Sequence, residues 1–308
     1  MAGPHEESRL AAGPGQRYRA DPLVRATFAF PQTIIDPAIR WGRQLKHVIC
    51  KSPGIVLRVA AFSRTSHVIW WLTPAKGKTV ILAKGAERPK SAFLGQYDLF
   101  YTCEIVYYSR EGSGVPILKE CSPLKPRSSL RDDWRAAVCA SYLCALVSGA
   151  SVAGSQQTDF YHLLDQGLDN LCRQGASRLL LRWFELRLMG VAGLSPTLSR
   201  CAACHRAVPA ASAPVVAYSR GGVICRKCAM GLEDVVSPIR LDVLAVLRHW
   251  QACETPEAAR RVVCSKVQEQ DIDVAVRSFL RHHLDSASTA ATIAFDLLRQ
   301  DGESGVQQ

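Results

Sequence analysis

The sequence predicts an α+β protein in two parts, a small N-terminal β-barrel followed by a helical domain that carries a four-cysteine metal module. Three observations support this prediction. About five strand-like segments with short turns lie between residues 46 and 121, helical periodicity begins at Leu130, and two C-x2-C pairs lie within the helical part. A length of 308 residues is sufficient for two domains.

Residues 1–45 precede the first expected strand and are rich in Gly, Pro, Ala and Arg, without a sustained apolar period. This composition is typical of a disordered extension, which we expect here. We expect no signal peptide, because the first residues lack an apolar core. The chain has 12 cysteines, and without a secretion signal we expect it to fold in a reducing cytoplasm rather than through disulfides.

Residues 46–128 form the predicted barrel domain. The expected strands are His47–Arg58 with a Pro-Gly break, a hairpin over residues 66–84, Leu99–Tyr108 and Val115–Cys121. Five short strands are best arranged as a small closed or half-closed barrel, because closure removes exposed strand edges.

Residues 129–308 form the predicted helical domain. Apolar residues recur at helical spacing over residues 131–148, 158–173, 176–189, 271–285 and 289–299. Ser237 and Pro238 indicate a further helix start, with serine at the N-cap and proline at the first helical position, and another short helix begins at Pro256. The uncharged stretch Ala136–Thr158 is rich in small and polar residues, so a buried helix is preferred to a membrane span.

The net charge of +11 is confined mainly to one segment. Residues 43–135 carry 16 Lys or Arg and 7 Asp or Glu, whereas residues 136–308 carry 17 and 16. A surplus concentrated in the barrel region indicates an anion-binding surface, with nucleic acid as the first candidate. An ordinary soluble basic domain is the alternative interpretation.

Two cysteine pairs predict a metal site at about residues 198–230. Cys201 and Cys204 form one pair, Cys225 and Cys228 form the other, and 20 residues separate the pairs. This spacing is typical of zinc bound by four thiolates. A single pair would leave a redox function open, but two pairs at this spacing favour a metal. Four protein ligands leave no open position, so we expect structural Zn²⁺.

Cations and aromatic residues alternate along the basic segment, as in proteins that bind single strands. Any one of these aromatic residues is more often part of a core than a stacking platform. Trp70 and Trp71 point to opposite faces of a strand, so at most one of them faces outward. The candidate DNA-binding residues are Arg58, Arg64, Lys76, Lys78, Lys84, Arg88 and Lys90.

No established catalytic motif is present: the sequence has no phosphate-binding loop, nucleophile elbow, HExxH or dinucleotide fingerprint. We therefore expect a protein that is not an enzyme. One alternative is a nucleic-acid-processing enzyme whose site is too dispersed to recognise in the sequence. The other is an RNA-binding zinc protein, because OB folds also bind RNA and no residue pattern here distinguishes RNA from DNA by its 2′-hydroxyl.

From about residue 48 to 300 the chain resembles the bacterial RecO family of recombination and repair proteins. The similarity is carried by GIVLRVAAFSRTSHVIWWLTPAKGKTVILAKGAERPKS, LGQYDLFYTCEIVYYSR, LKECSPL, FELRLMGVAGLSPTLSRCAAC and GGVICRKC. The extension 1–45 lies outside it, and the polar tail DGESGVQQ departs from it.

The resemblance implies a five-stranded OB-fold barrel, zinc on the four cysteines and basic barrel positions that face DNA. It further implies binding of single- and double-stranded DNA and annealing of complementary strands. The implied partners in this RecF pathway are RecR, RecF and the single-strand-binding protein, with which RecO proteins load RecA onto gapped DNA. A cytoplasmic, nucleoid-associated protein without a membrane partner is expected.

Overall fold

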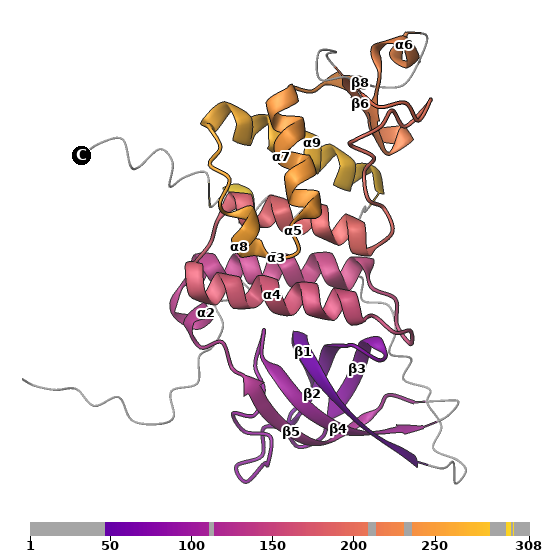
Figure 1. Cartoon of the computed structure of the whole chain (residues 1–308). Helices are drawn as coiled ribbons and strands as arrows, with labels where there is room; N and C mark the ends of the chain where they lie inside the picture. The colour runs from indigo at the N-terminus through magenta and orange to yellow at the C-terminus, as the bar shows by residue number, and fades with distance from the viewer. Residues whose placement is uncertain are drawn as a thin grey trace, which may run out of the picture. The chain divides into compact units, whose positions relative to one another are not determined.

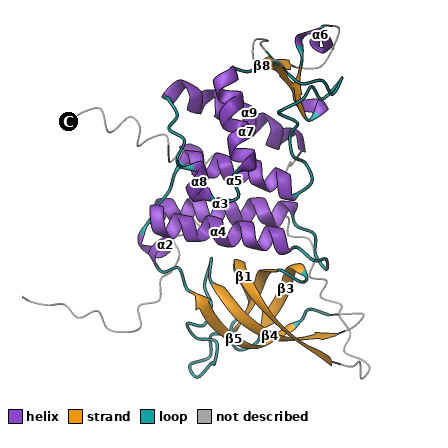
Figure 2. Ribbon diagram, viewed as in Figure 1, coloured by secondary structure: helices purple, strands orange, loops and turns teal. Residues whose placement is uncertain are grey.

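The computed structural model describes residues 47–110, 114–208, 214–230, 236–283, 294–296 and 298. The predicted extension 1–45 and most of the expected helix at 289–299 lie outside these residues. Five long strands come first and are followed by helices, with a small second sheet inserted late in the chain (Figures 1 and 2). Among the described residues, every helix is too short or too polar to span a lipid bilayer.

The first five strands form a closed barrel in the order β1-β2-β3-β5-β4. β1 closes it, because residues 47–55 pair with β4 and residues 55–63 pair with β2. β3 and β5 pair in parallel and the other neighbours are antiparallel. This arrangement agrees with the expected OB-fold. The strands are β1 (His47–Ser63), β2 (Ser66–Thr73), β3 (Gly77–Ala83), β4 (Thr102–Arg110) and β5 (Ile117–Lys125).

β1 continues through Pro53 and Gly54, where the sequence indicated a break. Pro53 pairs with Glu104 of β4 and Gly54 pairs with Cys103. A Cβ atom on Gly54 would lie 3.0 Å from Cε3 of Trp71. The absent side chain therefore lets the strand pass closely over the central ring of the barrel core.

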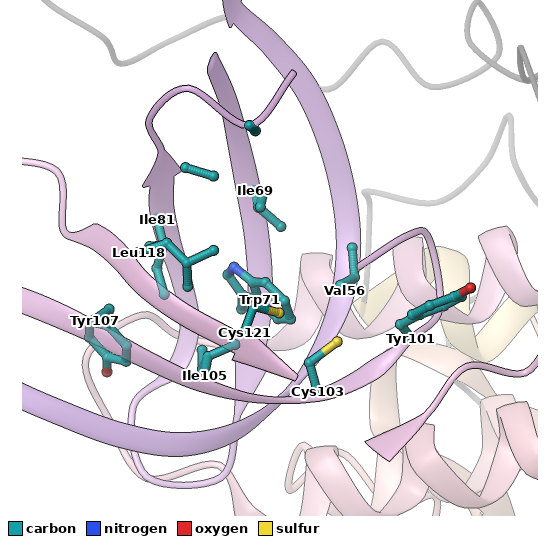
Figure 3. Packing of buried hydrophobic residues seen from close by; sticks show 12 residues of the cluster. Val56, Ile69, Trp71, Ile81, Tyr101, Cys103, Ile105, Tyr107, Leu118 and Cys121 are labelled. Carbon is teal, nitrogen blue, oxygen red and sulfur yellow. The ribbon is translucent and has the colours of Figure 1, made fainter. Parts of the chain in front are cut away.

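The barrel core surrounds Trp71, which is fully buried (Figure 3). The preceding residue, Trp70, points to the outer face of the barrel, as the alternation of side chains along a strand requires. A register shift between Val56 and Arg58 places Arg58 opposite Trp70 on that outer face. The other core residues include Val56, Ile69, Ile81, Tyr101, Cys103, Ile105, Tyr107, Leu118 and Cys121.

The helical part begins directly after the barrel. Asp133 caps α3, because its carboxylate accepts hydrogen bonds from the backbone N–H groups of Arg135 and Ala136. Most of α3 is buried, which supports the interpretation of the uncharged stretch as a buried helix. The helices are α2 (Ser129–Asp132), α3 (Trp134–Ala150), α4 (Thr158–Gln174), α5 (Arg178–Val191), α7 (Leu241–Ala252), α8 (Pro256–Ala259) and α9 (Lys266–His283).

A second, three-stranded sheet follows α5 in the order β7-β6-β8. It consists of β6 (Val215–Ala217), β7 (Gly222–Ile224) and β8 (Val236–Pro238), with the 3-10 helix η1 (Tyr218–Arg220) and helix α6 (Arg226–Ala229). The prediction of a helix start at Ser237-Pro238 is wrong, because both residues pair with β6 and α7 begins only at Leu241. Proline is tolerated at this position because β8 is an edge strand.

Polar contacts join the barrel to the first helices. The ammonium of Lys125 lies 2.6 Å from Oδ2 of Asp165 and 2.8 Å from Oδ2 of Asp169, and both acids belong to α4. At the β2–β3 turn, the N–H of Gly154 donates to the carbonyl of Lys76. The barrel and helices α3 and α4 are therefore linked at more than one point.

Candidate metal centre and nucleic-acid interface

The structure brings Cys201, Cys204, Cys225 and Cys228 together, with all four Sγ atoms within 4.8 Å of one another. The Sγ atoms of Cys204 and Cys225 are 3.9 Å apart. Four sulfurs arranged tetrahedrally around zinc at about 2.3 Å would be separated by about 3.8 Å. The donor set and its spacing therefore fit a tetrahedral metal ion.

Local structure explains how the two pairs meet. Cys201 and Cys204 lie at a tight turn, whereas Cys225 is the N-cap of the short helix α6 and Cys228 lies within it. The hairpin β6–β7 returns the chain so that the second pair lies beside the first. The backbone N–H of Cys225 donates to Sγ of Cys201 at 3.3 Å, and the N–H of Cys204 donates to the same sulfur at 3.5 Å. Such N–H donors orient a sulfur and stabilise its thiolate form.

The pKa values of Cys201 and Cys228 are shifted in opposite directions. Burial acts to raise the pKa of Cys201, but backbone N–H donors from Cys225, Cys204 and Ala203 prevail and lower it to about 6. Hydrogen bonding to the neighbouring sulfurs of Cys225 and Cys204 raises the pKa of Cys228 to about 12. Four crowded thiolates repel one another, so a divalent cation is the natural counter-charge for this site.

Four of the predicted DNA-binding residues lie at one end of the barrel. The N–H of Glu87 donates to the carbonyl of Thr65 at 3.1 Å, which holds the β1–β2 turn against the segment after β3. The N–H of Gly85 likewise donates to the hydroxyl of Ser66. All four side chains are exposed, and we call this group the basic end: Arg64, Lys84, Arg88 and Lys90.

Hydrogen bonds within the fold brace the loop that carries Arg88 and Lys90. His67 lies on β2, with Nδ1 2.8 Å from the hydroxyl of Tyr97 and Nε2 3.0 Å from Oε1 of Glu87. Burial raises the pKa of Tyr97, so its hydroxyl stays protonated. The loop is therefore tied to β2 while its cations remain at the surface.

Arg58 lies on the outer face of the barrel wall. Its guanidinium carbon is 4.8 Å from the centroid of the Trp70 ring, and both side chains are half-buried. A cation over an aromatic face fixes the orientation of both groups. Trp70 therefore lies on the outer face, whereas Trp71 belongs to the core.

The structure places the remaining two candidates near the opposite end of β2 and β3. Lys78 donates from Nζ to the carbonyl of Ser148 at 2.8 Å, close to the C-terminus of α3. Lys76 lies 3.5 Å from Sγ of Cys50 and 5.8 Å from the centroid of the Tyr107 ring. The seven predicted cations thus do not form one surface.

Charge counts over large segments missed a further group of cations beside the metal centre. The helical half is nearly neutral overall, but residues 186–232 contain six Lys or Arg and no Asp or Glu. A count over a window of this size would have found the group. Four of the six flank the cysteines: Arg200, Arg206, Arg226 and Lys227.

These features define a class of protein: an OB-fold barrel with a basic end, joined to a helical domain with a cluster of four cysteines that could bind a metal ion. Comparison with known families agrees with that class. Residues 47–127 match the family described as "Recombination protein O N terminal", and residues 131–290 match "Recombination protein O C terminal". This chain belongs to the RecO family.

Individual relatives support this assignment. The chain is 31% identical over 199 residues to a protein named "DNA repair protein RecO" from Desulforudis audaxviator, with 64% of this chain and 77% of that protein covered. It is 26% identical over 240 residues to the protein of the same name from Alkaliphilus metalliredigens, with 77% and 95% covered. The resemblance inferred from the sequence motifs is confirmed.

Proposed function

We propose that this protein acts in DNA repair and homologous recombination as a mediator that binds DNA and is not an enzyme. The single observation that carries the proposal is the basic end on an OB-fold barrel in a chain of the RecO family. The names of its relatives, "DNA repair protein RecO", support the same role.

In this proposal, the basic end binds the phosphodiester backbone. Exposed lysine and arginine side chains neutralise phosphates and release counterions, which favours binding without sequence preference. The outer-face pair of Arg58 and Trp70 adds a stacking platform for unpaired bases. A surface of this kind accepts both single- and double-stranded DNA, because every contact is to backbone charge or to a generic base face.

Annealing follows from the same chemistry. Two complementary strands repel each other through their phosphates, and bound cations reduce that repulsion. Contacts that read no sequence leave base edges available for pairing. We therefore propose that the protein anneals complementary strands and prepares gapped DNA for RecA loading. The proposed partners are RecR, RecF and the single-strand-binding protein in the cytoplasm.

The metal centre has a structural role in this proposal. Zn²⁺ held by four cysteine thiolates has no open position for water or substrate, so it provides no hydrolytic chemistry. It would connect the turn after α5 to the β6–β7 hairpin and α6. Each of these elements is only three or four residues long, so bonds from the metal to both cysteine pairs would stabilise them.

A strand-annealing assay tests the function. Complementary oligonucleotides, first naked and then coated with single-strand-binding protein, are mixed with enough of the purified chain to saturate the strands. We expect pairing to be accelerated in both cases. A chain that accelerates neither pairing reaction would contradict the proposal. Competition with RNA of the same sequence separates DNA binding from the alternative, because preferential displacement by RNA would favour an RNA-binding protein.

A further inference from the structure

The metal centre lies inside the acid-free stretch of residues 186–232. Two carboxylates, Glu233 and Asp234, follow this stretch and lie outside the described residues. The basic end accounts for the charge of the barrel, but it leaves this second concentration of cations without a function.

The cations lie within two residues of the metal ligands in the sequence. Arg200 precedes Cys201, and Arg206 comes two residues after Cys204. Arg226 and Lys227 occupy the two positions between Cys225 and Cys228. Because the four sulfurs lie within 4.8 Å of one another, the residues that flank them are drawn to the same place.

Backbone contacts hold the first knuckle in shape. The N–H of Cys201 donates to the carbonyl of Arg206 at 2.8 Å, and Arg200 forms an antiparallel bridge with Ala207. Arg200 and Arg206 therefore come from adjacent extended segments. Arg226 and Lys227 lie in α6, which starts directly after Cys225.

The charged groups face solvent. All four side chains are exposed, and no ion pair or cation–π contact with another described residue occupies any of them. Nor does any of them donate from its side chain to a cysteine sulfur within the part of the chain that the structure describes. Their charge is thus available to an external anion, since it is not engaged in hydrogen bonds to the cysteine sulfurs.

The metal adds a second consequence. Zn²⁺ with four thiolates carries a charge of about −2, which four cations outweigh. Clustering four cations costs free energy through mutual repulsion, and a polyanion lowers that cost by supplying counter-charge. A chain of phosphodiesters matches a surface of several exposed Arg and Lys side chains.

We propose that Arg200, Arg206, Arg226 and Lys227 form a second contact surface for the nucleic-acid backbone, which we call the module patch, and that the bound metal ion assembles it. The proposal deepens the DNA-binding function and rests on it for the identity of the ligand. It assigns the metal centre a role in positioning DNA contacts as well as in stability.

The test compares three variants of the full-length, metal-loaded chain, each of which loses four positive charges. The patch variant carries Arg200→Gln, Arg206→Gln, Arg226→Gln and Lys227→Gln. The control variant neutralises exposed cations of the helical part in the same way at Arg173, Arg261, Lys266 and Arg281. The barrel variant neutralises the basic end. Zinc content and the thermal unfolding midpoint establish that each variant is folded and loaded.

Affinity for a labelled mixed-sequence single strand is measured against salt concentration. We expect the patch variant to lower the slope of log affinity against log salt by about 3, since each lost phosphate contact accounts for about 0.7. The control variant should keep the wild-type slope. A patch variant that matches the control variant would overturn the inference, and a loss in the barrel variant alone would do so while leaving the proposed function intact.

Metal removal provides a second readout. Chelation should reduce the salt slope of the wild type to that of the patch variant and leave the slope of the patch variant unchanged, because the metal and the cations act together. An equal decrease of the salt slope in the wild type and in the patch variant after chelation would contradict assembly of the module patch by the metal.

Discussion

Arg127, just after β5, donates from Nε to Oδ1 of Asp169 on α4 at 2.8 Å. Its side chain is only 3% exposed, and it also donates to Asp165, to the hydroxyl of Thr102 and to the carbonyl of Phe100. The residue adopts a φ of 44°, which non-glycine residues rarely do. One buried guanidinium thus ties β4, the end of the barrel and α4 together at the cost of a strained backbone.

Removal of this guanidinium should destabilise the protein. Arg127→Met leaves two carboxylates and a carbonyl without their main donor, although Lys125 remains beside both acids. We expect the free energy of unfolding to fall by about 3 kcal/mol, at the lower end for a broken buried ion pair. Urea unfolding measures it. Arg131→Met is the control, because Arg131 pairs with Asp98 at 3.6 Å at the surface and should cost less than about 1 kcal/mol. Equal losses of unfolding free energy in the two variants would show that the buried contacts of Arg127 stabilise the protein no more than a surface ion pair does.

The same contact predicts a pH dependence. Burial acts to raise the pKa of Asp165, but Lys125 and Arg127 prevail and hold it below its usual value of 3.8. A lowered folded-state pKa gives stability that is complete above the unfolded value and is lost as pH falls through the folded one. The stability difference between wild type and Asp165→Asn should therefore be constant from pH 7 to about 5 and shrink below about pH 4. A difference that grows on acidification would reverse the assigned sign.

Lys78 should behave as a structural residue rather than a DNA contact. Its ammonium donates to the carbonyl of Ser148, where the dipole of α3 favours a cation. Lys78→Met is expected to lower unfolding free energy by about 1–2 kcal/mol and to leave the salt slope of DNA binding unchanged. Urea unfolding and a salt titration on the same sample separate the two roles. A reduced slope at wild-type stability would instead place Lys78 in the DNA surface.

Loss of ligands should release the metal. Cys201→Ser with Cys225→Ser removes one sulfur from each pair, and two remaining thiolates cannot hold zinc tightly. We expect zinc content to fall from one ion per chain to near zero, with a lower thermal unfolding midpoint. Cys139→Ser is a matched control for cysteine loss elsewhere, because Cys139 lies on α3 away from the cluster. Full zinc content in the double variant would contradict the four-thiolate centre.

The sequence predicted those features that depend on local spacing. Two C-x2-C pairs predict a shared metal site because the short spacing brings the two sulfurs of each pair close together, and the four sulfurs do converge. Two segments rich in β-branched and aromatic residues, with a turn containing Pro and Gly between them, likewise located the hairpin over residues 66–84, which the structure has as β2 and β3. Here local geometry and tertiary structure agree.

Features that depend on tertiary packing were not predictable from pattern. Lys78 and Lys84 lie on or beside the same strand and look alike in sequence, yet one contacts the end of α3 and the other lies at the exposed basic end. Ser237 and Pro238 have the local signature of a helix start, but their pairing with β6 overrides it. The role of Arg127 arises only from contacts with residues about 25 to 42 positions away.

The salt dependence of single-strand binding by the barrel variant tests the central claim most directly. This variant carries Arg64→Gln, Lys84→Gln, Arg88→Gln and Lys90→Gln on the exposed basic end. The account predicts weaker binding and a slope of log affinity against log salt that is shallower by about 3, with wild-type stability. Wild-type affinity and slope in this folded variant would contradict the assignment of the barrel end as the DNA-binding surface.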